Sequence, residues 1–144
     1  MKLTISIAIV ASLVASAMAA PISNGTNTTD TCHHYSIDNF SYNLQYTVFY
    51  SLVSFTIGNT EAATPSFVCS PAETEFEPGS VYTCTQDPTF SFSYNSVTND
   101  LSLWEQVDGG VVTGDAVVGA VDCDQLTSDQ QRCFAGQNVT VSLT

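Results

Sequence analysis

Basic side chains are almost absent from this sequence of 144 residues, which has two Lys and Arg residues together against fourteen Asp and Glu and a formal net charge of −12 at pH 7. Lys2 lies at the amino terminus and Arg132 near the other end. Proteins that bind nucleic acids or anionic membranes use Lys and Arg to neutralise phosphates, so the composition argues against both partners. The acidity is expected to keep the protein soluble at an acidic extracellular pH.

Long apolar runs are also scarce, and the one that exists is at the amino terminus. Lys2, an apolar run at residues 5–14 and small side chains at residues 15–20 follow the order of a signal peptide. We therefore predict that residues 1–20 are removed, that residues 21–31 form a flexible arm that can carry glycans, and that residues 32–144 form one domain. No later segment has the ~20 apolar residues of a membrane span, so a secreted, extracellular protein is expected.

Four Asn-x-Ser/Thr motifs begin at Asn24, Asn27, Asn39 and Asn138. These motifs accept N-linked glycans in proteins that pass through a eukaryotic secretory pathway. Asn24 and Asn27 are the preferred sites because they lie close together in the predicted arm.

The sequence has five cysteines, and export into an oxidising compartment favours disulfides. Sequence alone does not assign the pairs, but short separations favour Cys69 with Cys84 and Cys123 with Cys133. Each bridge should contribute about 2.5–3 kcal/mol by restricting the unfolded chain. Cys32 has no partner left, so we expect it to join two copies in a disulfide-linked homodimer.

Apolar residues alternate with polar ones, which is the pattern of β-strands with one face on a core. From residue 40 to residue 50 every even position is apolar or aromatic, which predicts one long strand. Similar alternation begins at Val53, Phe90, Leu101 and Val139, and turns are expected at Gly58 and Asn59, Pro78 and Gly79, Asn99 and Asp100, and at 108–110. A short helical turn is expected at most around residues 126–131. The prediction is an all-β fold, a compact antiparallel β-barrel or sandwich stapled by two disulfides.

Residues for catalysis are hard to assemble from this sequence. His33 and His34 are adjacent and follow the predicted arm, so we expect them to be solvated and poorly held as a general base. Glu73, Glu75 and Glu77 share one side of an extended segment, which predicts a solvated face or a charged edge strand. The histidines lack a second cluster of ligands at zinc-like spacing, and Asp122, Asp124 and Asp129 lack the Gly and the terminal Glu of an EF-hand calcium loop. No enzymatic activity, catalytic residue, metal or cofactor is predicted.

The order of the features resembles the Alternaria major-allergen family of fungal secreted proteins. The resemblance runs from Cys32 to Leu143 and rests on YSLVSF at residues 50–55, FVCS at 67–70, VYTC at 81–84, FSFSY at 90–94, LSL at 101–103, and Cys123 and Cys133 before a closing strand. It implies a compact β-barrel. It also implies that Cys69–Cys84 and Cys123–Cys133 are bridges within the chain and that Cys32 joins two subunits.

The resemblance implies three hypotheses about function. Members of the family include an airborne allergen and elicitors or effectors of plant pathogens, so the first is a secreted protein that binds a plant defence protein in the host apoplast. The second is a carrier of a small phenolic ligand of the flavonoid type, and the third is a structural protein of the fungal wall or spore surface. A site that relies on several Arg or Lys contacts would not be preserved, because Arg132 is the one cation left after signal removal.

Overall fold

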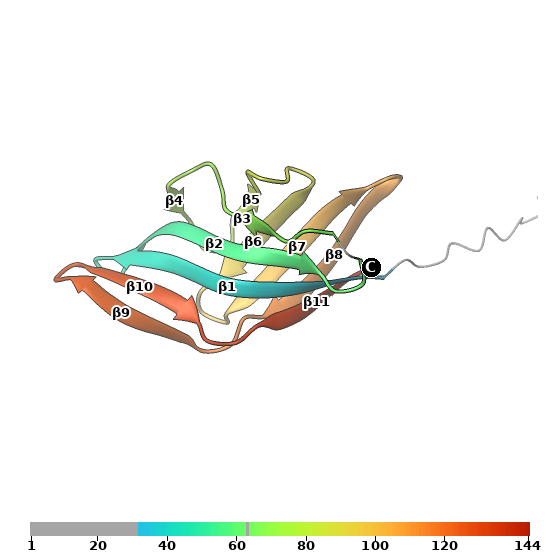
Figure 1. Cartoon of the computed structure of the whole chain (residues 1–144). Helices are drawn as coiled ribbons and strands as arrows, with labels where there is room; N and C mark the ends of the chain where they lie inside the picture. The colour runs from blue at the N-terminus through green and yellow to red at the C-terminus, as the bar shows by residue number, and fades with distance from the viewer. Residues whose placement is uncertain (1–31, 63) are drawn as a thin grey trace, which may run out of the picture.

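The structure is a computed structural model that describes residues 32–62 and 64–144, and over these residues the chain forms strands and no helix (Figure 1). The strands are β1 (His33–Gln45), β2 (Phe49–Asn59), β3 (Phe67–Cys69), β4 (Glu75–Phe76), β5 (Val81–Thr83), β6 (Phe90–Asn95), β7 (Asp100–Val107), β8 (Gly110–Val117), β9 (Val121–Thr127), β10 (Gln130–Ala135) and β11 (Val139–Leu143). The all-β prediction is confirmed. Within this part of the chain, none of the elements is a helix of the length and apolarity that a membrane crossing requires.

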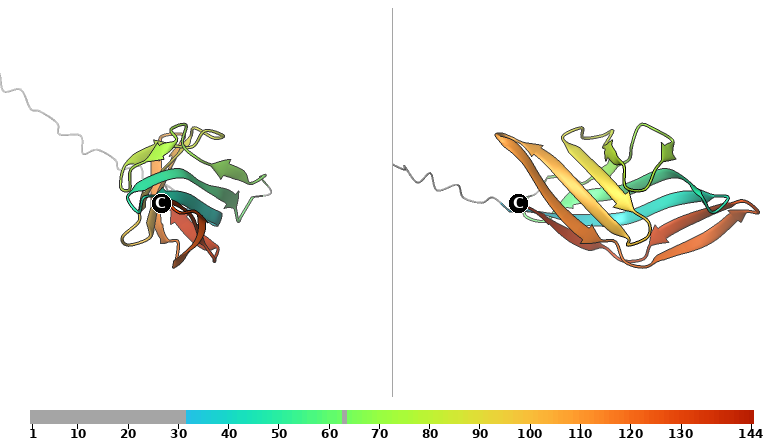
Figure 2. Two further views of the ribbon diagram at one scale, coloured as in Figure 1. Left: turned by 90° about the vertical axis from the view of Figure 1, so that its left-hand side faces the viewer. Right: turned by 180° about the vertical axis from the view of Figure 1, so that it is seen from behind.

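Two antiparallel sheets pack against one another, with the second crossing the first (Figure 2). The first has the order β3-β2-β1-β10-β9, with β11 also paired to β1 and β4 to β2, and the second has the order β5-β6-β7-β8. The ladders do not close into one continuous barrel. On one side, the backbones of Thr113 and Thr144 exchange hydrogen bonds of 3.3 and 3.2 Å. On the other, the Thr85 amide donates to the Ser70 carbonyl at 2.9 Å, so backbone hydrogen bonds join the two sheets on both sides.

Aromatic and branched side chains fill the space between the sheets. The alternating residues at 53, 55 and 57, at 90, 92 and 94, and at 101 and 103 all point inward and are almost fully buried. The rings of Phe40 and Tyr94 lie 4.6 Å apart, and those of Phe55 and Phe92 meet edge to face at 5.1 Å. Such ring pairs add to the free energy gained by burial, and they make the scaffold rigid.

The prediction of one strand over residues 40–50 is wrong in its second half, because the chain turns back at residues 46–48. Tyr46 and Thr47 have φ values of 51° and 61°, and the Val48 amide donates to the Gln45 carbonyl at 3.2 Å. Phe40 and Tyr42 are buried as predicted, whereas Tyr46 and Val48 are exposed. The even positions stay apolar through the turn, so they did not indicate where the chain reverses.

Strand β1 also begins earlier than predicted and changes face midway. Tyr35 and Ile37 are buried at odd positions, and Phe40 and Tyr42 at even ones. Asn39 lies between them with φ of 55°, where the register against β2 shifts. This β-bulge supplies the extra residue that moves the inward side chains from odd to even positions.

Two further local expectations are wrong. Residues 126–131 contain the turn between β9 and β10 and no helical turn. Gly58 and Asn59 lie inside β2, where they pair with Ser36 and Tyr35. The turns at Gly79 and Gly109 are present, with φ values of 89° and 102° that glycine adopts without strain.

The structure contains two disulfides with different surroundings. Cys69–Cys84 closes a separation of 15 residues, and both of its residues are buried where β3 meets the chain after β5. Cys123–Cys133 closes a separation of 10 residues and joins facing positions of β9 and β10. The first bridge therefore links the two sheets, and the second staples one hairpin. Cys32 is half-buried and is the free cysteine of the described residues.

Candidate functional site

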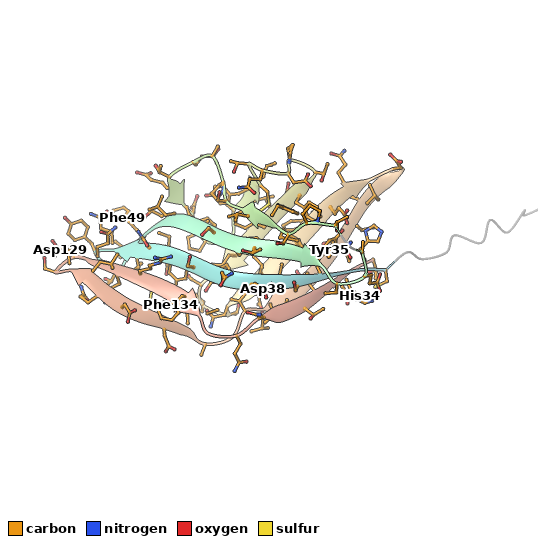
Figure 3. All side chains as sticks on the ribbon, in the orientation of Figure 1. His34, Tyr35, Asp38, Phe49, Asp129 and Phe134 are labelled. Atoms are coloured by element: carbon orange, nitrogen blue, oxygen red, sulfur yellow. A yellow bond between two sulfur atoms is a disulfide. The ribbon has the colours of Figure 1, made fainter. Side chains whose placement is uncertain are left out.

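One end of the molecule is formed by the turn between β1 and β2, where Figure 3 shows Phe49 and Asp129. The Tyr46 amide donates to the Asp129 carbonyl at 2.8 Å, which ties this turn to the turn between β9 and β10. Tyr46 and Thr47 occupy the left-handed region without being glycine. That conformation costs about 1–2 kcal/mol per residue, and strain of this kind is concentrated at functional sites.

Three apolar side chains at this end, and a fourth further along β2, remain in solvent. Tyr46 is 57% exposed, Val48 63%, Phe49 63% and Leu52 58%. Leu52 has φ of 52° and lies where the pairing of β1 with β2 shifts register, which directs its side chain away from the core. We call these four residues the tip surface. An apolar group that the fold leaves exposed in one place is typical of an interaction site.

Beside the tip surface lies a groove of about 630 Å³, which we call the tip groove. Its sides are β2 and the segment from β4 to Pro78, and Tyr50 faces Phe76 across the β2–β4 pair. The ring of Phe76 is buried and lies 5.0 Å from the ring of Tyr82, which also lines the groove. The groove is thus aromatic along its base.

Carboxylates stand at the rim of the tip groove. Glu75 and Glu77 are exposed and line it, whereas Glu73 is exposed but outside it. The Glu77 amide donates to the Tyr82 hydroxyl at 2.8 Å, and the Gly79 amide donates to the Tyr94 carbonyl at 2.8 Å. These hydrogen bonds fix the acidic wall in place. No Lys or Arg is among the described residues that line the groove, so it combines aromatic surface with negative charge.

The histidines lie at the opposite end (Figure 3) and are held by strand β1, contrary to the expectation of a solvated tail. His33 Nδ1 lies 2.8 Å from Glu105 Oε2, and the Tyr35 hydroxyl donates to the same oxygen at 2.9 Å. Burial, followed by the hydrogen bond to Glu105, raises the pKa of Tyr35 above its ordinary value. His33 therefore anchors the start of β1 to β7.

His34 has partners of the kind found in catalytic triads, which the sequence did not indicate. Its Nδ1 lies 2.8 Å from Ser142 Oγ, its facing residue on β11, and its Nε2 lies 3.7 Å from Glu61 Oε1. The 3.7 Å distance from Nε2 to Glu61 is beyond hydrogen-bonding range, so Glu61 does not orient the ring as the acid of a triad does. All three side chains lie at the surface, outside the tip groove.

Of the sequence motifs for glycosylation, Asn39 and Asn138 lie in the described residues and are exposed. Asn39 lies at the bulge of β1, and Ser41, the third residue of its motif, is buried in the folded chain. Asn24, Asn27, the predicted signal peptide and the predicted arm lie outside the described residues.

The comparisons with known proteins agree with one another. Residues 37–140 match the family model described as Alternaria alternata allergen 1. Two solved structures, "Crystal structure of Alternaria alternata allergen Alt a 1" and "Crystal structure of alternaria alternata major allergen alt a 1", each superpose with a TM-score of 0.69 at 21% identity over 77% of this chain. The match covers 87% of the first of those chains and 92% of the second, and at this identity it shows the shared fold. No curated protein matches in sequence.

Proposed function

The chain belongs to the Alternaria alternata allergen 1 family, and from that premise we propose that it is a secreted, non-enzymatic protein that binds a plant defence protein in the host apoplast. Family membership supports the allergen-like character of the protein. The choice of a protein partner rests on the tip surface and the tip groove.

The observation that carries the proposal is the exposure of Tyr46, Val48 and Phe49 beside Glu75 and Glu77. Aromatic side chains are the commonest anchors of protein interfaces, since they bury a large area at low entropic cost. Carboxylates around them favour a partner with Lys or Arg near an apolar patch, and they increase the rate of encounter. With a net charge of −12, the whole molecule attracts the same class of partner.

Binding without catalysis also agrees with the arrangement of the titratable side chains. His33 is engaged by Glu105, and His34 lies on an open strand surface. No three His, Cys, Asp or Glu residues in the described chain come together as a metal site. The tip groove itself offers carboxylates, hydroxyls and rings and no basic side chain.

A disulfide between two copies through Cys32 is part of the proposal. Cys32 immediately precedes β1, at the end of the molecule opposite the tip surface (Figures 1 and 3). A dimer joined there would leave both tip surfaces free and double the number of sites for one partner surface. Electrophoresis without reductant should show a dimer that reductant and Cys32→Ser each convert to monomer, and a monomer in every lane would contradict the dimer alone.

The proposed function is tested by affinity capture from apoplastic fluid. Purified protein is immobilised, and the retained proteins are identified and compared for the wild type, Val48→Ser with Phe49→Ser, and Val97→Ser as the control. Val97 is 89% exposed and lies away from the groove, so its change should have no effect. A basic protein that the wild type and the control retain and the tip variant loses supports the proposal.

Equal retention on all three columns, or none on the wild type, would contradict it. A phenolic compound that co-purifies and occupies the tip groove would favour the carrier hypothesis instead. Tight association with fungal walls without capture of any protein would favour the structural one.

A further inference from the structure

A second groove lies on the outer face of the sheet β5-β6-β7-β8, which Figure 2 (right) presents toward the viewer. Its volume is about 480 Å³, and it is separate in its lining residues from the tip groove. We call it the Trp104 groove, since it contains the single Trp of the sequence. The family match and the proposed function give it no role.

Strand alternation explains why Trp104 faces outward. Its neighbours in β7, Leu103 and Leu101, are buried in the core, so residues 102, 104 and 106 point to the other face. Trp104 pairs with Ser91 of β6 on one side and Thr113 of β8 on the other. A half-buried indole is therefore flanked across the sheet by hydroxyl groups.

The loop before β6 forms a fixed wall of this groove. Asp87 Oδ1 accepts hydrogen bonds from the Thr89 amide at 3.1 Å and from the Thr89 hydroxyl at 2.6 Å. The Gln106 amide donates to the Thr89 carbonyl at 2.8 Å, which joins the loop to β7. A wall that is already ordered loses little entropy when a ligand binds.

The chemistry of the Trp104 groove differs from that of the rest of the surface. None of its described lining residues ionises, although fourteen residues of the sequence are acidic. Val81 and Val111, which are 62% and 59% exposed, add apolar area beside Trp104. Ser91, Thr89 and Gln106 supply hydroxyl and amide groups around it.

This combination fits a neutral sugar chain better than other ligands. A pyranose ring presents a C–H face that stacks on an indole, and its hydroxyls bond to side chains at the ring edge. A purely apolar ligand would leave those polar groups without partners. An anionic ligand would be repelled by the net charge. A peptide adds as a strand to the edge of a sheet, and this groove lies on the face of one, so strand addition of a peptide is excluded here.

We propose that the Trp104 groove binds a neutral, unbranched β-1,4-linked glucan chain. Such a chain is a flat ribbon with alternating apolar faces and hydroxyl edges, which suits a sheet surface with one indole and flanking hydroxyls. The Trp104 groove is separate from the tip groove, so a molecule that is bound to a glucan chain of a cell wall keeps its tip surface free.

The test is a titration of the purified full chain with cellohexaose, followed by the emission of its single Trp and by calorimetry. We expect a saturable change in emission and binding that weakens about tenfold or more in Trp104→Ala. Trp104→Phe and Gln106→Ala should fold as the wild type does and bind several-fold more weakly by calorimetry. Val117→Ser, on the same sheet but outside the groove, should bind like the wild type.

No binding of cellohexaose at millimolar concentration, or equal binding by wild type and Trp104→Phe, would overturn the proposal. Tighter binding of an oligogalacturonate than of cellohexaose would overturn the proposal that the ligand is neutral. Tighter binding of laminarihexaose would overturn the proposal that it is β-1,4-linked. Because the tip variant Phe49→Ser should bind cellohexaose normally, failure here is distinguishable from failure of the proposed function.

Discussion

The tip groove and the Trp104 groove are built on the same rigid scaffold but differ in charge. Glu75 and Glu77 line the first, whereas the described lining of the second has no ionisable side chain. The first adjoins a strained turn with exposed rings, and the second lies over a regular sheet with one indole. The difference teaches that strand alternation places the indole and the hydroxyls of the neutral groove on one face, whereas the exposed rings of the acidic groove depend on a turn that departs from regular β-structure.

The largest effect is expected when a feature that supports both grooves is removed. The chain between Cys69 and β6 supplies Glu75 to the tip groove and Val81 to the Trp104 groove, and the Cys69–Cys84 disulfide pins it to β3. Cys69→Ser with Cys84→Ser should lower the free energy of unfolding by about 3 kcal/mol or more, because the closed loop is lost and two hydroxyls enter the core. Denaturant unfolding measures this.

The matched control is Cys123→Ser with Cys133→Ser, whose bridge staples one hairpin. It should cost about 2.7 kcal/mol or less and leave both grooves working in the protein that remains folded. If the control were the more damaging variant, the disulfide that links the two sheets would not be what holds the grooves in place.

A rise in pH above 10 should lower the free energy of unfolding of the core that supports both grooves. Burial raises the pKa of Tyr35 and of Tyr94 above their ordinary value, so in the folded state they keep protons that the unfolded chain releases. Their contribution to stability is present below about pH 10 and declines above it by up to about 1.4 kcal/mol per pH unit for each group. Thermal unfolding at pH 9, 10 and 11 should show it, with a shallower decline in Tyr94→Phe. A melting temperature that stays level or rises from pH 10 to 11 would contradict this linkage.

Removing the charges at the rim of the tip groove should change binding there and not at the Trp104 groove, with a smaller effect than the changes above. Glu75→Gln with Glu77→Gln should slow association of a basic partner a few-fold at low salt and leave cellohexaose binding unchanged. Association rates at low and high ionic strength measure it, and Glu73→Gln, outside the groove, is the control. A loss of equal size in the control would assign the effect to net charge alone.

The smallest effect is expected at the cluster of Ser142, His34 and Glu61, which lies outside both grooves. Because its side chains are exposed and Glu61 lies 3.7 Å from the His34 ring, hydrolysis of p-nitrophenyl acetate should be the same for wild type and Ser142→Ala. Saturable hydrolysis that Ser142→Ala abolishes would overturn the non-enzymatic proposal.

Sequence predicted the inward faces of the regular strands well, since Phe90, Phe92 and Tyr94 alternate without interruption and all three are buried. It failed at the tip surface for a physical reason. Tyr46 and Val48 continue the alternation through a turn that contains no glycine, proline or asparagine, so their exposure gave no local signal. The consecutive apolar residues Val48, Phe49 and Tyr50 were the one available hint, because they break the period of two.

The Trp104 groove and the histidine contacts could not be predicted for a different reason. Trp104 meets Ser91 and Thr113 only through pairing between strands, and His33 meets Glu105 from 72 residues away. Periodicity assigns a side chain to a face, but it does not say which strand lies beside it.

The most direct test of recognition through the tip surface uses the apoplastic protein that the wild-type column captures. This protein is titrated calorimetrically into three samples: the wild type, Phe49→Ser and Trp104→Phe. If the tip surface contacts the partner, Phe49→Ser weakens binding about tenfold or more while Trp104→Phe binds like the wild type. Undiminished binding by Phe49→Ser, or a comparable loss in Trp104→Phe, would contradict recognition through the tip surface.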